Sequence, residues 1–285
     1  NWKQISIIKE MEDQAFMYEG PDFFEVNDNK WVLATSPMGQ APEGYTRQNT
    51  SVNSWQSGSF DGLNFVPDSK LYEVDRGHDF YATQSTATPD GRRVVIAWMN
   101  MWRLPYLSAP DRWCGALTLP RVITWNDGHL YQQPVEETKS LRLKEYSFDN
   151  SATRLTSTVK HINNSSALEL LMKFKPSDND AEQYGLAIGN SIRLFVDRQT
   201  RTLTMFRTDL NATSYRALPL EWDKEHDLHI FIDSSSIEVF VDHGHDVMTT
   251  NFFGADHNVS LYATNGTAAI RDVKVYELDR PFLTV

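Results

Sequence analysis

This chain of 285 residues contains one cysteine, Cys114, and no cluster of lysine and arginine side chains. A single cysteine excludes an internal disulfide, so the fold must be stable without covalent cross-links. No apolar run approaches the roughly 20 residues needed to span a bilayer, which argues against a membrane partner. The net charge of −11 argues against nucleic acid as a partner, because phosphate binding needs a basic surface.

The lack of disulfides also bears on localisation. It is compatible with a reducing compartment, and we therefore expect a cytoplasmic protein. Secretion stays open, because Asn1 is not a natural start and a leader would be absent from the sequence as it stands.

Short alternating runs of β-branched and aromatic residues, separated by turn signals, predict a nearly all-β fold. The predicted strands are 30–35, 93–99, 116–119, 167–174, 184–188, 192–197, 203–207, 228–233, 236–241, 259–264 and 268–276. Positive φ angles for tight hairpins are expected at Asn126-Asp127-Gly128, Gly189-Asn190 and Asn265-Gly266, with a similar turn at Asp90-Gly91.

The two halves of the chain differ in loop length and in the density of predicted strands. Residues 1–136 carry long loops with proline, glycine and tryptophan, as expected where loops converge on a binding site. Residues 148–285 have denser strands and shorter loops. The polar residues 137–147 between them are predicted to be a linker that includes a turn of helix.

The motif with the clearest chemistry is Met17-Tyr18-Glu19-Gly20-Pro21-Asp22-Phe23-Phe24, just before a predicted strand. Its apolar and aromatic frame disfavours a charged carboxylate, and a carboxyl group that stays protonated suits a general acid. The alternative is that Glu19 is a turn residue beside Pro21.

Six further segments follow in order: Ser36-Pro37-Met38-Gly39, Ser57-Gly58-Ser59-Phe60, Asp75-Arg76-Gly77-His78-Asp79-Phe80-Tyr81-Ala82, 92–99, 115–121 and 231–241. With the Glu19 motif, they resemble glycoside hydrolase family 32, the invertase, sucrose-6-phosphate hydrolase and levanase group. In that family a Trp/Tyr-Glu-Cys-Pro-Asp-Phe motif supplies the general acid/base, and here Gly20 replaces the usual cysteine. The resemblance covers nearly the whole chain.

Two motifs of that family are missing. The nucleophile lies in an Asn-Asp-Pro-Asn motif and a transition-state-stabilising aspartate in an Arg-Asp-Pro motif, both before the glutamate. Neither occurs here. We therefore expect this chain to be the C-terminal part of a longer enzyme, and inactive alone.

The resemblance implies the last blades of a five-bladed β-propeller in residues 1–136, followed by a β-sandwich in residues 148–285. It implies Glu19 as the acid/base and Asp79, Tyr81 and Trp98 as sugar contacts, with no cofactor and no metal. Trp98 has a second interpretation as a core residue. Asp22 is expected to orient the Glu19 loop through an Asx-turn rather than to contact sugar.

The sequence also contains two histidine pairs and a serine run, but their spacing argues against a metal site and against a serine nucleophile. His226 and His229 would face opposite sides of a strand, and His243 and His245 lie in a turn that no cluster of carboxylates or thiols accompanies. The run Asp233-Ser234-Ser235-Ser236 is predicted to be a hairpin turn rather than a serine nucleophile.

The expected partners are a small-molecule sugar and the missing N-terminal segment of the same protein, with self-association through the open propeller edge as a further option. The predicted activity is hydrolysis of β-fructofuranosidic bonds by a retaining mechanism. A noncatalytic carbohydrate-binding module and a fructosyltransferase of the same family are the alternatives.

Overall fold

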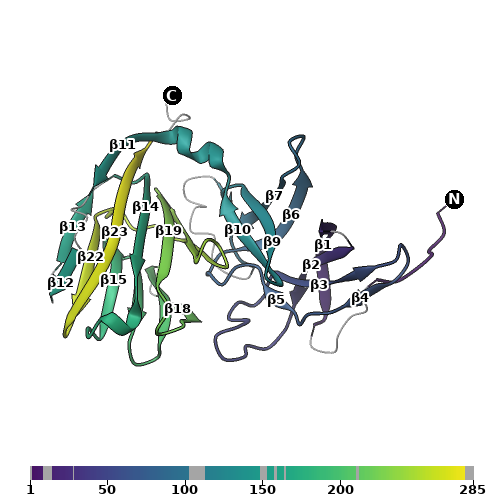
Figure 1. Ribbon diagram of the computed structural model, residues 1–285, viewed down its shortest axis with the longest axis horizontal. Coiled ribbons are helices and arrows are strands. Elements are labelled where there is room, and N and C mark those ends of the chain that lie inside the picture. Colours follow the sequence, from purple (N-terminus) through teal and green to yellow (C-terminus); the bar gives the residue numbers. More distant parts are fainter. Residues whose placement is uncertain are drawn as a thin grey trace.

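The computed structural model describes residues 2–8, 15–27, 29–102, 113–147, 153–156, 159–163, 165–209 and 212–279. These residues form two lobes of β-sheet, joined by the short 3-10 helix η2 (Glu136–Leu141) (Figure 1). A second 3-10 helix, η3 (Pro176–Asp178), lies in the second lobe. The nearly all-β prediction is therefore confirmed. In these ranges no helix has the length and apolar character to cross a membrane.

The first lobe contains two antiparallel sheets whose strands follow one another in chain order. One sheet has the order β1-β2-β3-β4, with β5 pairing to β3, and the other has the order β10-β9-β7-β6, with β8 pairing to β7. This up-and-down arrangement is that of propeller blades. The strands are β1 (Met17–Asn27), β2 (Lys30–Met38), β3 (Ser54–Phe60), β4 (Phe65–Pro67), β5 (Tyr72–Glu73), β6 (Tyr81–Ala87), β7 (Arg93–Met99), β8 (Ala116–Leu117), β9 (Arg121–Asn126) and β10 (His129–Pro134).

The two sheets of the first lobe meet at strands β1 and β6. The Asp22 carboxylate in β1 accepts a hydrogen bond of 2.8 Å from the backbone N–H of Ser85 in β6. The Gln84 side chain of β6 donates a bond of 3.1 Å to the carbonyl of Gly20 in β1. Asp22 therefore links the two sheets, a longer-range contact than the local Asx-turn expected from the sequence.

The second lobe is a sandwich of two antiparallel sheets. One has the order β11-β23-β14-β19-β20-β21, with β12 pairing to β23, and the other has the order β13-β22-β15-β16-β17-β18. The strands are β11 (Arg142–Ser147), β12 (Thr153–Thr156), β13 (Val159–Asn163), β14 (Leu168–Phe174), β15 (Gln183–Ile188), β16 (Ile192–Asp197), β17 (Thr202–Asp209), β18 (Ala212–Pro219), β19 (His226–Asp233), β20 (Ser236–Val241), β21 (Asp246–Asn251), β22 (Val259–Thr264) and β23 (Thr267–Leu278). Residues 142–147 of the expected linker thus form a strand of the sandwich.

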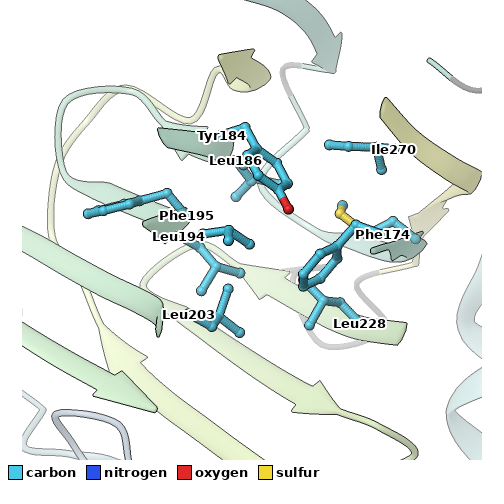
Figure 2. A pocket seen from close by; sticks show the side chains of 11 residues that line it. Phe174, Tyr184, Leu186, Leu194, Phe195, Leu203, Leu228 and Ile270 are labelled. Carbon is cyan, nitrogen blue, oxygen red and sulfur yellow. The ribbon is translucent and has the colours of Figure 1, made fainter. Parts of the chain in front are cut away.

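The sandwich core is densely filled, because alternate residues of each strand point between the sheets. Figure 2 shows the side chains around a small gap in this core, a cavity of about 10 Å³ lined by Phe174, Tyr184, Leu194 and their neighbours. A water molecule needs roughly this volume together with polar partners, and the lining is almost entirely apolar. The gap is therefore a packing defect rather than a ligand site.

Every segment predicted to be a strand forms one or contributes to one. The Asn126-Asp127-Gly128 turn joins β9 to β10 with φ angles of 48° at Asp127 and 79° at Gly128, as predicted. The hairpin predicted at Asn265-Gly266 was wrong. Both residues have positive φ, but the turn carries the chain from one sheet of the sandwich to the other, because β22 and β23 belong to different sheets.

Candidate active site

Glu19 lies where strand β1 departs from regular pairing. Glu19 pairs with Ser36 of β2, but Asp22 pairs with Ala34, so that two residues of β1 stand opposite one residue of β2. Gly20 in this β-bulge has a φ of 53°, a left-handed conformation that glycine adopts without strain. Bulges bend an edge strand and redirect the neighbouring side chain. The Glu19 side chain is partly exposed.

A second bulge lies opposite, in strand β6. The register shifts between Tyr81 and Gln84, and Ala82 has a φ of 55°, which is uncommon for a residue with a Cβ atom. The Tyr81 hydroxyl donates a hydrogen bond of 2.9 Å to Oε2 of Glu19 and lies 3.3 Å from the backbone carbonyl of Ser36. The structure therefore brings together two predicted site residues that are 62 positions apart in the sequence.

The Tyr81 side chain is only 1% exposed. Burial raises the pKa of its hydroxyl far above the usual value, and the hydrogen bond to Glu19 and the charge of that carboxylate raise it further. Tyr81 is thus a permanent hydrogen-bond donor at any physiological pH.

An aromatic surface adjoins this pair. Trp98 of β7 is the direct cross-strand partner of Tyr81. Its ring lies 5.1 Å from that of Trp102, which in turn lies 6.4 Å from the Tyr81 ring. Trp102 is 40% exposed, and Trp98 is partly exposed. Gly115 allows the indole to approach the backbone, because a Cβ atom there would lie 2.2 Å from Nε1 of Trp98.

A group of buried polar side chains adjoins the strands that carry this pair. Asn53 is 2% exposed, and its Nδ2 donates to Oγ of Ser36 at 2.7 Å and to Oγ1 of Thr83 at 3.3 Å. Ser36 faces Glu19 across the ladder, and Thr83 lies in the bulge of β6. Through Asn53, these bonds connect β2, the partner of the Glu19 strand, to β6, the strand of Tyr81.

The fourth predicted site residue, Asp79, lies in a different environment. It is 2% exposed, and its Oδ2 accepts bonds from the guanidinium of Arg207 at 2.5 Å and from the backbone N–H of Asn251 at 2.8 Å. Both partners belong to the sandwich. Asp79 thus joins the chain just before Tyr81 to the second lobe.

Sequence reasoning did not select Trp102, Ser36 or Asn53. Trp102 stands four residues after Trp98 and three beyond the end of strand β7, and a second aromatic residue so close to Trp98 was an available signal. Ser36 was named only as part of a family segment. Its contact with Tyr81 is made by the backbone carbonyl, which does not depend on the residue type. Asn53 acts through contacts across strands, which sequence spacing does not reveal.

The histidine pairs serve other purposes. His226 contacts the Asp242 carboxylate at 3.0 Å, while His229 contacts Glu169 at 2.7 Å, so the two rings are held by different carboxylates. The backbones of Asp233 and Ser236 pair across the turn between β19 and β20, which is the hairpin predicted there.

A larger cavity, of about 460 Å³, lies between the lobes. Leu117, Leu119 and Phe231 contribute to a lining that is mainly apolar, and the one buried carboxylate in it, Glu238, is bonded to Arg121. Glu19, Tyr81 and Trp98 are not among the described residues that line it. The Glu19 carboxyl group and the neighbouring aromatic surface therefore lie outside this cavity.

Comparison with known proteins places this geometry in a family. Residues 1–134 match the model for the glycosyl hydrolases family 32 N-terminal domain, and residues 137–277 match the model for the family 32 C-terminal region. Sucrose-6-phosphate hydrolase and raffinose invertase, both from Escherichia coli, are each 36% identical to the chain over 274 residues. Each match covers 93% of this chain but only 56% of the relative, so the chain spans about half the length of these enzymes.

Solved structures agree with the fold. A sucrose-6-phosphate hydrolase from Lactobacillus gasseri superimposes with a TM-score of 0.77 at 27% identity, covering 95% of this chain and 56% of that one. A β-fructofuranosidase from Bombyx mori gives a TM-score of 0.81 at 24% identity, with 98% and 58% covered. The predicted architecture of propeller blades followed by a β-sandwich is confirmed. The family resemblance of the motifs is confirmed as well, and the chain belongs to glycoside hydrolase family 32.

Proposed function

We propose that this chain supplies the general acid/base and part of the sugar site of a β-fructofuranosidase. The observation that carries the proposal is the Glu19 carboxyl group, held by Tyr81 beside the partly exposed rings of Trp98 and Trp102. The printed names of the relatives, sucrose-6-phosphate hydrolase and raffinose invertase, support a fructoside substrate. Sucrose, sucrose 6-phosphate and related fructosides are the substrates we propose.

The proposed reaction is a double displacement with retention. A nucleophilic carboxylate attacks the anomeric carbon of the fructosyl unit, the glycosidic C–O bond breaks, and Glu19 gives its proton to the leaving oxygen. Water then attacks the fructosyl–enzyme ester. Glu19, now a carboxylate, accepts a proton from that water, and the nucleophile is released in its original form.

The nucleophile in this scheme comes from outside the given sequence, because the Asn-Asp-Pro motif of the family does not occur in it. We call this chain, preceded by a segment with that motif, the intact enzyme. Exposed apolar side chains on the first lobe support such a neighbour. Trp2, Ile5, Phe16, Leu63 and Val66 are each at least 47% exposed, as expected of surface that another blade would cover.

Trp98 and Trp102 are proposed to contact the sugar through their flat faces, which suit the C–H face of a furanose. The sugar contact expected of Asp79 stays a prediction. Its bonds to Arg207 and Asn251 support a second role for it, in fixing the loop before Tyr81 against the sandwich.

Two assays test the proposal. The purified 285-residue chain should release no fructose from sucrose or from sucrose 6-phosphate. The intact enzyme should release fructose, with glucose as the second product from sucrose and glucose 6-phosphate as the second product from sucrose 6-phosphate. Fructose release by the chain alone would overturn the proposed division of the catalytic carboxylates. An intact protein that binds fructan without cleaving it would favour the carbohydrate-binding alternative, and transfer to a sugar acceptor in preference to water would favour the transferase.

A further inference from the structure

We propose that Tyr81 is a positioning residue that assigns different tasks to the two oxygens of Glu19, anchoring Oε2 and leaving Oε1 to transfer the proton. This inference rests on the proposed function, in which Glu19 is the acid/base. It gives Tyr81 a role distinct from the sugar contact that the family resemblance implies.

The first argument is accessibility. A side chain that contacts a sugar must present surface to it, yet Tyr81 is 1% exposed. Trp102, whose ring lies 6.4 Å from that of Tyr81, is 40% exposed and is the more accessible aromatic of the two. Tyr81 thus reaches the reaction through the carboxylate that it holds.

The second argument concerns the number of protons. The Tyr81 hydroxyl has one hydrogen and two acceptors within reach, Oε2 of Glu19 at 2.9 Å and the Ser36 carbonyl at 3.3 Å. When Glu19 is a carboxylate, the shorter, charge-assisted bond is the stronger. When Glu19 is protonated on Oε2, that proton occupies the position in which the Tyr81 hydroxyl hydrogen bonds to Oε2. When Glu19 is protonated on Oε1 instead, the hydrogen bond from Tyr81 to Oε2 stays intact. The acidic proton is therefore favoured on Oε1.

The third argument is that the pair cannot easily separate. The Gln84 side chain ties the bulge of β6 to Gly20, and the Asp22 carboxylate ties β1 to Ser85. These bonds hold both bulges at a fixed separation, so the hydroxyl and the carboxyl group are preorganised before substrate binds. A geometry prepared in this way raises kcat more than it lowers KM.

A double-mutant cycle in the intact enzyme tests the inference. Tyr81→Phe removes the hydroxyl and keeps the ring, and we expect kcat on sucrose to fall about 10-fold to 100-fold with KM changed less than about 3-fold. In a Glu19→Gln background the same Tyr81→Phe change should cost less than about 3-fold, because the group on which Tyr81 acts is already disabled. Tyr72→Phe, in which a tyrosine stacked on Trp55 loses its hydroxyl, is the matched control and should leave kcat unchanged.

The outcomes distinguish a failure of this inference from a failure of the proposed function. If Tyr81→Phe lowers activity by the same factor in both backgrounds, or mainly raises KM, Tyr81 acts independently of Glu19 and the inference is wrong. If Glu19→Gln itself leaves kcat unchanged, the proposed function fails instead. Melting temperatures of all variants exclude unfolding as the cause, and the pH profile gives a further readout, since a purely structural loss would scale activity equally at every pH.

Discussion

Arg121 of β9 and Glu238 of β20 form an ion pair of 2.7 Å between the lobes, with the arginine side chain fully buried and the glutamate side chain 4% exposed. The same guanidinium also binds Asp75 at 3.1 Å and Oγ1 of Thr249 at 2.7 Å. Burial raises the pKa of Glu238, against the opposing effect of the Arg121 charge. This cluster makes the sandwich a structural support for the loop that leads into Tyr81.

Removing the arginine should destabilise the whole chain. Arg121→Met would leave Asp75 and Glu238 buried without a cation, and we expect a loss of about 3–5 kcal/mol in the free energy of unfolding. Urea denaturation measures it. Arg92→Met is the control, because Arg92 pairs with Glu137 at the surface and should cost less than about 1 kcal/mol. Equal losses of unfolding free energy in the two variants would show that the buried ion pairs of Arg121 contribute no more to stability than the surface ion pair of Arg92.

A second contact between the lobes depends on pH. The rings of His129 and His245 stack at 3.9 Å, and Nε2 of His129 donates to the His245 carbonyl at 3.0 Å. Nδ1 of His245 bonds to Asp246, which also accepts from Arg76. Burial, and then the charge of His245, lowers the pKa of His129 below its ordinary 6.5.

Because the pKa of His129 is lowered on folding, the unfolded chain binds this proton more readily, and stability is lost as the pH falls below about 6.5. His129→Phe keeps a ring in the stack and removes the titration. The drop in unfolding free energy between about pH 7.5 and about pH 5.5 should therefore be smaller in the variant. An unchanged drop would mean that other groups set the acid limit of stability.

The bulge at Gly20 predicts a modest effect of Gly20→Ala. A Cβ atom there would lie 3.5 Å from Nε2 of Gln84 and 3.7 Å from Oγ of Ser36, which are ordinary contacts. The cost should come from the left-handed φ of 53°, at about 1–2 kcal/mol. Thermal unfolding checks it. A much larger loss of stability would indicate that the backbone of β1 changes conformation at the bulge. In that case kcat of the intact enzyme should fall as well.

Trp98→Phe separates sugar contact from core packing. Trp98 is partly exposed, so we expect kcat/KM of the intact enzyme to fall with little change in melting temperature. A packed core position would behave in the opposite way, losing about one to several kcal/mol of stability with unchanged kinetics. Steady-state kinetics and thermal unfolding on one preparation decide between them.

Much of the fold was predictable because its strands carry the usual signals. The β-branched and aromatic residues of β19 and β20 alternate clearly, and the turn between them is polar. Strand β21 was missed, because Thr249 and Thr250 are polar yet fully buried. Their burial depends on partners from the other lobe, such as Asp75 and His78, that are more than 170 positions away.

Contacts between residues distant in the sequence also limited the prediction of the candidate site. The Glu19 motif and the family pattern led to the prediction that Glu19 is the acid, because a carboxyl group among apolar residues suggests a raised pKa and a role in proton transfer. The bond from Tyr81 to Glu19 was not predictable, since it needs two bulges in separate sheets to face each other. The family resemblance implied a sugar contact at Asp79, but the sequence could not reveal the bonds of Asp79 to the sandwich.

The most direct test of the central claim compares two substrates of the intact enzyme with Glu19→Gln. If Glu19 is the acid, kcat on sucrose should fall by about 10² to 10⁴, because the leaving sugar needs protonation. An aryl fructoside with a good leaving group needs little protonation, so fructosylation of the enzyme should lose far less rate on that substrate in single-turnover measurements. Equal losses on the two substrates would contradict the assignment of Glu19 as the general acid.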